Sequence, residues 1–437
     1  MSFKTDKQTL EELNLLGKFR QGSVYHLFNR VKTRGGEKLL DEMFHHPLLN
    51  ETEINNRSAV FRYFQEAGLH FPFDTMQINL MREYLDSGSK KNAPMVLLDV
   101  LCKKLLSNLT RDERFKKIVQ GLQATIVTLK KCAVFIETLP HKNDIFNMRI
   151  EAARSILSDK HIAQLLNTDI YQDLPLRTIA YYDHLLKNAL AKQVQQLLGF
   201  IYELDVNIAV GNVASTRGFT YATALPAEKN IFSAGNLCHP CLEGAVGNNI
   251  TMSDTKNLLF LTGANMAGKS TLMKSVGIAM YLAHMGFPVP AREMEFSVRE
   301  GMYTSINVAD NIGLGYSHFY AEVVRVKQAA QATASGSRLL LIFDELFKGT
   351  NVKDAYDGTL AVTEAFADYA DCLFVVSTHI IEVGEALEKN ANIQFSFMPT
   401  VMDGVRPRYT YKLQQGITED RQGMMIIRNE GILELLQ

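Results

Sequence analysis

The sequence predicts two parts: a helical first half, and a second half of the α/β class with a parallel sheet. Three observations support this prediction. Apolar residues recur at helical spacing through most of residues 1–230. Residues 258–261 form an apolar run typical of a buried strand, and a glycine-containing turn and a second helical pattern follow it. Two later apolar runs, at 338–343 and 373–377, each end in polar residues, as strands do at the ligand-binding edge of a parallel sheet.

The length and composition limit the number of domains, the location and the cysteine chemistry that we expect. A chain of 437 residues is expected to form two or three domains, and we place the border near residue 230, giving domains of 1–230 and 231–437. No apolar run approaches the ~18 residues needed to span a membrane. The N-terminus has no signal-peptide pattern, so we expect a cytoplasmic protein. Five scattered cysteines fit reduced thiols better than a disulfide framework.

The two halves differ in charge. Residues 1–230 hold 30 Lys and Arg against 25 Asp and Glu, a net charge of +5, and the remainder holds 16 against 22, a net charge of −6. A mildly basic half permits a local surface for a polyanion. An ordinary solvated surface explains the charge equally well, and it is also the simpler interpretation of the lysine pairs at 103–104, 116–117 and 130–131.

The first half should contain several amphipathic helices. We expect them over residues 6–19, 37–46, 93–108, 111–138, 145–157 and 176–208. Ser23 is a candidate cap for a helix ending near residue 28, and Asn50 with Glu53 forms a variant capping box. Glycines, hydroxyl residues and aromatics mix in residues 210–224, which predicts an irregular boundary with short strands. No heptad run is long enough for an extended coiled coil.

A phosphate-binding loop follows the strand at 258–261. Its residues match G-x-x-x-x-G-K-[ST] and are Gly263, Ala264, Asn265, Met266, Ala267, Gly268, Lys269, Ser270 and Thr271. The glycines let backbone N–H groups converge on phosphate oxygens, and the following helix adds its unpaired N–H groups. Lys269 supplies a charge to the terminal phosphates, and the Ser270 hydroxyl is a candidate Mg²⁺ ligand. The loop therefore predicts a nucleoside triphosphate site.

The two later strands supply acidic and basic groups. Asp344 follows the strand at 338–343 and is expected to hold Mg²⁺, directly or through water. Glu345, the next residue, is the candidate general base for an attacking water. His379 follows the strand at 373–377 and is placed to reach the γ-phosphate. A Glu directly after the acidic strand end, with a downstream His, indicates a P-loop ATPase of the ABC type.

Cys238 and Cys241 form a CxxC pair around His239 and Pro240. Zinc or redox chemistry is one interpretation. No second Cys/His pair at zinc-finger spacing accompanies them. The favoured interpretation is therefore that the two thiols are incidental and lie beside a structural His-Pro.

Several of these motifs together resemble the MutS family. The P-loop of that family contains the same Asn-Met pair as residues 263–271. The stretches that match its other signatures are 317–322 (S-H-F-Y-A-E), 344–351, 287–291, 377–379 and His239-Pro240. Residues 30–36, 46–48 and 54–57 are similar to the start of the MutS core, or lever, domain. The resemblance implies an α/β P-loop NTPase of ABC type preceded by an all-α helical core/lever domain.

The resemblance also implies cofactors and partners. ATP and Mg²⁺ are the expected cofactors, and Ser317 would begin a signature helix that caps the γ-phosphate bound by another subunit. One chain has one P-loop and one signature, so the family mechanism implies a homodimer. The expected DNA partner is duplex that is branched or otherwise distorted, held through its backbone.

The sequence also departs from the family. It begins close to the core-like segment and ends soon after Leu435, so we expect it to lack the mismatch-recognition, connector, full clamp and C-terminal dimerisation parts. Ala264 and Ala267 replace the usual Pro and Gly. Val246 stands where an adenine-stacking aromatic is expected. Two functions therefore stay open: an ATP-gated dimer acting on DNA in mismatch repair or recombination, and a nucleotide-switched scaffold that binds proteins.

Overall fold

The structure, a computed structural model, describes residues 2–17, 21–88, 92–110, 112–140, 144–169, 174–264, 266–306, 318–403, 406–418 and 435. It divides into two compact units. The sheet unit comprises Met1–Phe28, Met43–Ser58 and Val213–Gln437, and the helical unit comprises Asn29–Glu42 and Ala59–Asn212. The contacts thus group two N-terminal segments with the sheet, whereas the domain division at residue 230 stays a prediction.

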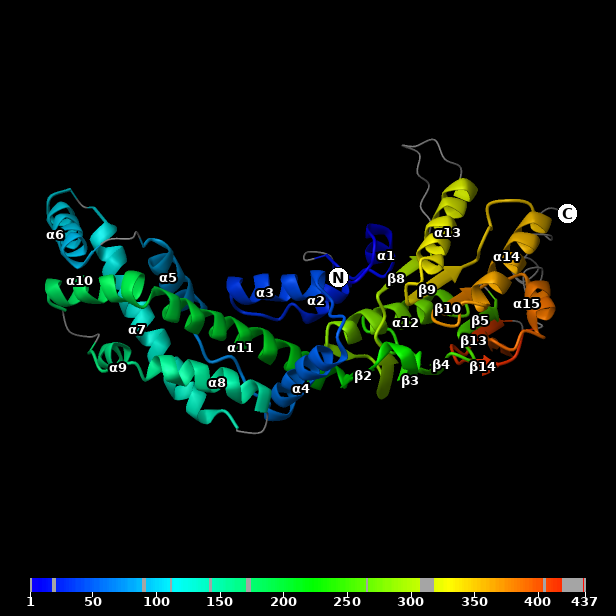
Figure 1. The fold of residues 1–437 in the computed structure, drawn as a ribbon, viewed down its shortest axis with the longest axis horizontal. Coiled ribbons are helices and arrows are strands. Elements are labelled where there is room, and N and C mark those ends of the chain that lie inside the picture. Colours follow the sequence, from blue (N-terminus) through cyan, green and yellow to red (C-terminus); the bar gives the residue numbers. More distant parts are fainter. Residues whose placement is uncertain are drawn as a thin grey trace. The chain divides into compact units, whose positions relative to one another are not determined.

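Every regular element that the structure describes in the helical unit is a helix (Figure 1). Three of its helices, α3, α4 and α11, extend across its borders. The helices are α3 (Arg34–His45), α4 (Glu51–Ala67), α5 (Thr75–Asp86), α6 (Ala93–Thr110), α7 (Arg114–Thr138), α8 (Asp144–Leu157), α9 (Lys160–Leu166), α10 (Leu176–His184) and α11 (Ala191–Arg217), with the π-helical turn η1 (Leu185–Ala189) between the last two.

These helices confirm the expected helical character, with differences in detail. The helix expected over 176–208 is divided by η1, and α11 continues through residues 210–217, where an irregular boundary was expected. The helix expected over 6–19 is only α1 (Lys7–Glu12). Asp6 caps it, Leu13 ends it, and Asn14 turns the chain with φ 49°. Helices α5 and α9 were not predicted.

Apolar side chains from α5, α7, α8, α10 and α11 form the core of the helical unit. Leu122, Ile126, Ile150 and Val194 are fully buried. Helix α11 is long and apolar enough to cross a membrane by length and composition alone, but 78% of its most apolar window is buried inside the structure. Its length and hydropathy therefore reflect its place in a protein core.

A six-stranded sheet organises the sheet unit. The strand order is β14-β11-β5-β10-β9-β8, and all neighbours are parallel except the edge pair β14 and β11. The strands are β5 (Leu258–Gly263), β8 (Gly301–Ser305), β9 (Leu339–Asp344), β10 (Leu373–Ser377), β11 (Ile393–Met398) and β14 (Gln414–Gln415). The three strands expected from the sequence, β5, β9 and β10, lie side by side, which confirms the α/β class.

Helices cover the parallel strands, and this explains their continuous apolar sequences. Alternate residues such as Phe260 and Leu341 pack in one core with α13 (His318–Ala334), α14 (Val352–Ala367) and α15 (Ile381–Leu387). The residues between them face α12 (Lys269–His284). A Cβ at Gly277 of α12 would lie 3.2 Å from Ile342 Cδ1, so the helix packs closely on β9.

The rest of the sheet unit consists of short elements. A four-stranded sheet has the order β2-β7-β3-β4, and β1 pairs with β6 and β12 with β13. These elements are α2 (Val24–Phe28), β1 (Thr220–Tyr221), β2 (Thr223–Leu225), η2 (Ala227–Lys229), β3 (Phe232–Leu237), β4 (Asn248–Met252), β6 (Pro288–Val289), β7 (Glu293–Ser297), β12 (Thr400–Asp403) and β13 (Arg406–Tyr409). The expected caps form: Ser23 Oγ accepts from His26 N, and Asn50 Oδ1 accepts from Glu53 N at 3.0 Å.

Candidate nucleotide-binding site

The loop between β5 and α12 has the backbone that a phosphate cradle requires. Gly263 and Gly268 have φ of 138° and 105°, and Met266 also has a positive φ of 70°. Lys269, 5% exposed, begins α12 and folds back over the loop, where its Nζ donates to Gly263 O at 2.7 Å and Ala264 O at 3.2 Å. Burial lowers the Lys269 pKa, and the nearby Asp344 and Glu345 oppose that shift. Asn265 lies outside the described residues.

Strand register brings the acidic group to this loop. Asp344 ends β9 beside Ser377 of β10, and β10 also pairs with β5. Ser270 Oγ, in the first turn of α12, donates to one carboxylate oxygen of Asp344, and Ser377 Oγ donates to the other. Hydroxyl and carboxylate oxygens are the ligands Mg²⁺ prefers. Ser270 and Asp344 therefore fit a magnesium site, and the sequence had not singled out Ser377 as the partner that orients Asp344.

Glu345 and His379 lie together at the same edge of the sheet. Glu345 Oε1 is 3.8 Å from His379 Nδ1, and Glu345 Oε2 is 3.8 Å from Lys348 Nζ. The neighbouring His379 lowers the Glu345 pKa, and the charges of Lys348 and Lys269 act in the same direction against the effect of burial. A carboxylate kept ionised in this way can accept a proton. Glu345 also has φ 53°, a strained value for a non-glycine residue that recurs at functional sites.

A cavity of about 490 Å³ adjoins the loop. Gly268, Lys269, Ser270, Thr271 and Glu345 line it, together with residues of the 239–246 segment, Val246 among them. Its size suits a nucleotide. Met266 lines it too and is 78% exposed, whereas Ala267 is buried. His379 is not among the lining residues and is 56% exposed.

The sequence analysis missed an aromatic residue in this cavity. Tyr411 lines it, and a Cβ at Gly268 would lie 3.0 Å from Tyr411 Cδ1. Asn248 holds this segment, because its Nδ2 donates to Tyr411 O at 3.0 Å and its Oδ1 accepts from Leu413 N at 2.7 Å. No local pattern marks Tyr411, since 163 residues separate it from Asn248.

The segment resembling a signature motif is described in part. Ser317 lies outside the described residues. Glu322 in α13 is 2% exposed, and its Oε1 accepts from Phe347 N at 2.8 Å. This bond connects α13 to the turn that follows Glu345, so the last residue of the motif has a structural role.

An N-terminal anchor, also missed from the sequence, holds α13 and β8. Arg325 of α13 is 4% exposed and forms an ion pair with Asp6, and its Nη2 donates to Thr9 Oγ1 at 2.9 Å. Glu12 accepts from Thr304 Oγ1 at 2.5 Å and from Ile306 N at 3.0 Å. Helix α1 thus positions the strand and helix on either side of the segment that carries Ser317.

The CxxC pair lies beside the cavity. Cys238 Sγ donates to Pro290 O at 3.4 Å, and His239 Nδ1 accepts from Cys241 N at 3.3 Å. Within the part of the chain that the structure describes, no group of three or more His, Cys, Asp or Glu side chains is arranged to hold a metal ion.

Comparison with known proteins gives two family matches and several relatives. The model of MutS domain III matches residues 8–211, and that of MutS domain V matches residues 259–434. Proteins named DNA mismatch repair protein MutS are similar: that of Petrotoga mobilis is 28% identical over 65% of this chain and 34% of its own length, and that of Pseudothermotoga lettingae is 23% identical over 99% of this chain and 64% of its own. The protein of that name from a Geobacillus species is 26% identical over 54% of this chain and 27% of its own length.

The matched part thus spans from about a quarter to less than two thirds of these relatives. The two domain models are consecutive along the chain and together cover most of it, including the P-loop, Asp344 and Glu345. With the α/β unit and the helical unit both in place, the chain belongs to the MutS family.

Proposed function

We propose that this chain binds ATP with Mg²⁺, hydrolyses it in a P-loop site of the ABC type, and uses the cycle to act on DNA in mismatch repair or recombination. The observation that carries the proposal is that Ser270, which lines the cavity together with Lys269, donates a hydrogen bond to Asp344. Ser270 and Asp344 offer oxygen ligands for Mg²⁺ and Lys269 offers a charge for the phosphates, and the sheet register brings Asp344 to the other two from 74 or 75 positions further along the chain.

The proposed roles follow from the chemistry of each group. The backbone of residues 263–271 and the start of α12 hold the phosphates, and Lys269 leaves its carbonyl partners for the β- and γ-phosphates. Ser270 and Asp344 hold Mg²⁺, which supplies charge neutralisation on the phosphates. Glu345 accepts a proton from the attacking water, and His379 orients Glu345 and reaches toward the γ-phosphate.

The site is proposed to be complete only in a dimer. Ser317 from a second copy would direct the N-terminus of α13 at the γ-phosphate. The contacts of Glu322 with Phe347, and of Arg325 with Asp6, would then connect this helix to the general base and to the N-terminal anchor.

Tyr411 is proposed to stack on the base of the nucleotide. The family resemblance assigns this stacking role to an aromatic residue near Val246. Tyr411 lines the same cavity as His239, and aromatic stacking accepts either purine. Tyr411→Ala should raise KM for ATP and GTP to a similar extent and leave kcat nearly unchanged, whereas an unchanged KM would exclude the stacking role.

The function is tested by ATPase rates with homoduplex, mismatched and branched DNA, measured together with DNA binding over a salt series. We expect Mg²⁺-dependent hydrolysis, stimulation by distorted duplex, and affinity that falls as salt rises. ATP hydrolysis with no binding to any DNA at low salt would contradict the DNA role and favour the nucleotide-switched scaffold.

A cytoplasmic location also stays a prediction.

A further inference from the structure

The turn after β9 carries Glu345 in an unusual backbone conformation. Glu345 and Phe347 have φ of 53° and 62°, so two of three consecutive residues lie in the left-handed region that non-glycine residues rarely adopt. Such a conformation costs free energy, and it persists only where the surrounding structure holds it in place. The position of the Glu345 carboxylate therefore depends on the contacts that hold residues 345–347.

Hydrogen bonds from three different elements hold this turn. They run from Glu345 N to Ser377 O of β10 at 2.9 Å, from Thr359 Oγ1 of α14 to Leu346 O at 3.1 Å, and from Phe347 N to Glu322 Oε1 of α13 at 2.8 Å. The first bond joins two backbone groups. The other two are made by buried side chains, so a substitution can remove either of them and leave the backbone of the turn unchanged in sequence.

Helix α13 also packs against the turn with an aromatic ring. The ring centres of Phe319 and Phe347 lie 6.2 Å apart in an edge-to-face arrangement. A Cβ at Gly349 would lie 3.1 Å from Phe319 N, so the lack of a side chain lets the two backbones approach closely. The start of α13 and residues 345–349 are therefore in close contact, and a movement of the helix would displace the turn.

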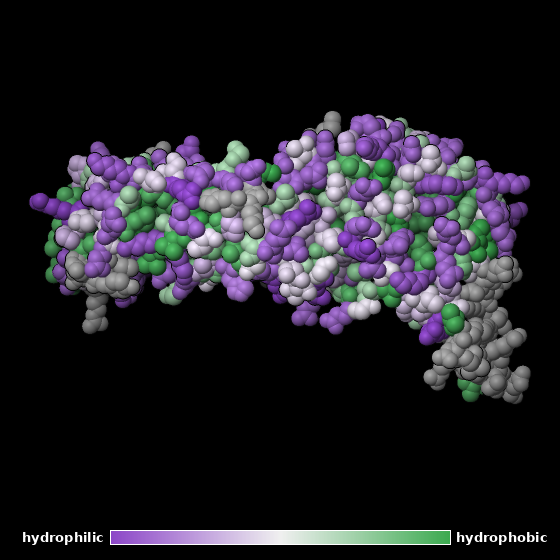
Figure 2. Space-filling model, turned by 90° about the horizontal axis from the view of Figure 1, so that it is seen from below, coloured by the Kyte–Doolittle hydropathy of each residue, from purple (hydrophilic) through white to green (hydrophobic). Residues whose placement is uncertain are grey.

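Glu322 is an unusual residue to find in this contact. Charged side chains normally stay in water, and hydrophilic residues cover much of the face of the protein shown in Figure 2. Glu322 is instead only 2% exposed. A carboxylate that accepts from a backbone N–H forms a shorter and stronger bond than a neutral acceptor does. Its bond to Phe347 is also the shorter of the two side-chain bonds that hold the turn.

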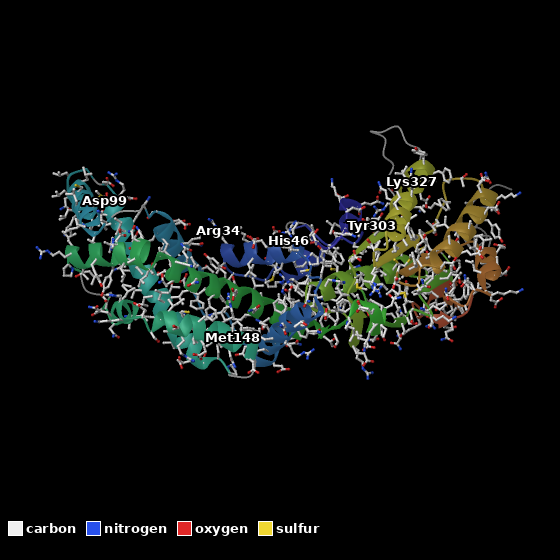
Figure 3. All side chains as sticks on the ribbon, in the orientation of Figure 1. Arg34, His46, Asp99, Met148, Tyr303 and Lys327 are labelled. Carbon is white, nitrogen blue, oxygen red and sulfur yellow. The ribbon has the colours of Figure 1, made fainter. Side chains whose placement is uncertain are left out.

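The same helix is fixed to β8 by Arg325. The centre of the Arg325 guanidinium lies 5.5 Å from the centre of the Tyr303 ring, and its Nη2 donates to Thr304 O at 2.7 Å. Tyr303 is labelled in Figure 3, together with Lys327 on the exposed face of α13. The buried residues Glu322 and Arg325 thus connect α13 to the turn and to β8.

We propose that Glu322 is a positioning residue for ATP hydrolysis: its carboxylate holds the turn at 345–347 and thereby keeps the Glu345 carboxylate in the cavity beside Lys269. The inference rests on the proposed function, in which Glu345 activates the attacking water. In the proposed dimer, α13 begins beside the nucleotide bound by the second copy. Glu322 then aligns Glu345 of its own copy only while α13 is in place, so the rate of hydrolysis depends on the position of this helix.

The first test compares two substitutions that are close to glutamate in size. Glu322→Gln keeps a side-chain oxygen that can accept from Phe347 N, whereas Glu322→Leu removes the acceptor. Single-turnover ATP hydrolysis with Mg²⁺ should slow by roughly 10- to 100-fold in Glu322→Leu and by less than about threefold in Glu322→Gln, because a small displacement of a reacting group has effects of this size. Affinity for a fluorescent ATP analogue should stay within about twofold of wild type in both, since residues 263–271 hold the phosphates.

Two substitutions on the same helix control for the stability of α13. Lys327→Ala alters its exposed face, and Thr333→Val replaces a side chain that is 2% exposed and donates to Ala329 O at 3.0 Å. Both variants should hydrolyse ATP like wild type. A wild-type rate in Glu322→Leu, an equal loss in Glu322→Gln, or an equal loss in Thr333→Val would overturn the proposal.

A third variant tests the turn from another element. Thr359→Val removes the bond to Leu346 O without altering α13, and it should slow hydrolysis by a smaller factor than Glu322→Leu. Circular dichroism shows whether each variant is folded. If Glu322→Leu does not fold, Thr359→Val decides the question, because a wild-type rate in that variant would mean that the turn does not set the rate.

The pH dependence of hydrolysis shows whether Glu345 has moved. The pKa of this carboxyl group is lowered by the neighbouring His379, Lys348 and Lys269, against the effect of burial. A relaxed turn takes Glu345 away from these groups, so Glu322→Leu should lose activity at a higher pH than wild type on acidification. Removal of the Glu322 charge acts in the opposite direction, so Glu322→Gln should not show this shift. An unchanged acid limb in Glu322→Leu would contradict the positioning role.

The same measurements separate this inference from the proposed function. Wild type that binds ATP with Mg²⁺ but does not hydrolyse it would contradict both. Wild type that hydrolyses ATP, together with a folded Glu322→Leu variant that does so equally fast, would contradict the positioning role alone and leave Glu345 as the proposed general base.

Discussion

The sheet unit and the helical unit each have an apolar core, but they differ in what their polar groups do. In the sheet unit, Lys269, Ser270, Asp344 and Glu345 converge at one sheet edge. In the helical unit, buried polar groups stabilise the backbone: Asp205, 1% exposed, accepts from Lys32 N, Thr33 N and Thr33 Oγ1 at the start of α3. The groups proposed for ATP hydrolysis therefore lie in the sheet unit, whereas Asp205 in the helical unit has a structural role.

The largest expected effect concerns the nucleotide site. Lys269→Ala should reduce ATP turnover by roughly 10²-fold or more, because one charge that stabilises the phosphates is removed. Circular dichroism should not change. Lys389→Ala is the control, since this exposed lysine lies outside the nucleotide cavity. Equal loss in both variants would mean that the phosphate cradle is not the site of turnover.

A substitution in the helical core should produce the opposite pattern. Leu122→Ala removes a fully buried side chain of α7 and should lower the free energy of unfolding by about 2–5 kcal/mol. Urea unfolding measures this loss, and nucleotide affinity under native conditions should stay the same. Val134→Ala, at a position 69% exposed on the same helix, should have little effect. A fall in nucleotide affinity with Leu122→Ala would mean that nucleotide binding also depends on the helical core.

His284 in α12 should make the sheet unit sensitive to acid. Burial lowers the pKa of His284 from 6.5 to about 4, and its ring bonds Leu48 O at 2.8 Å and accepts from Arg299 N at 3.2 Å. The unfolded chain binds a proton below about pH 6.5 that the folded chain excludes until about pH 4. The stability is therefore complete above pH 6.5 and falls as the pH drops toward 4, by up to roughly 3 kcal/mol.

The pH dependence is measured from urea midpoints between pH 4 and 7.5. His284→Gln should be less stable at neutral pH and should lose most of the slope in this range. A wild-type slope that the variant retains would assign the effect to another group.

The smallest effect is expected at the N-terminal anchor. Asp6→Ala should lower the free energy of unfolding by about 1–2 kcal/mol, because it leaves Arg325 buried without its carboxylate while Asp6 itself is partly exposed. Lys7→Ala is the control, since Lys7 has an exposed partner in Glu11. If α1 positions α13 for catalysis, Asp6→Ala should also lower kcat more than it changes nucleotide affinity.

The sequence predicted what local chemistry determines. The P-loop, Asp344 and Glu345 could be found because phosphate binding and Mg²⁺ binding require particular residues at particular spacings, and the strand at 258–261 because burial on both faces requires a continuous apolar run. Asp6 and Arg325 could not, since 319 positions separate them. The π-helical turn at 185–189 and the early end of α1 depend on tertiary packing, which the helical period does not encode.

Helix α6 is an intermediate case. Leu98 and Leu105 were included in the helix expected over 93–108, but a helical period does not distinguish residues packed in the core from residues at the surface. Only their exposed fractions, 63% and 61%, show that they lie at the surface.

We propose that Glu345 activates water for ATP hydrolysis in a site completed by a second copy. The most direct test is Glu345→Gln mixed with radiolabelled ATP and Mg²⁺, followed by sedimentation and analysis of the bound nucleotide. We expect the variant to form a dimer that retains intact ATP, while wild type releases ADP and phosphate and returns to its nucleotide-free association state. Continued hydrolysis by the variant, or bound ATP on a particle no larger than without nucleotide, would contradict it.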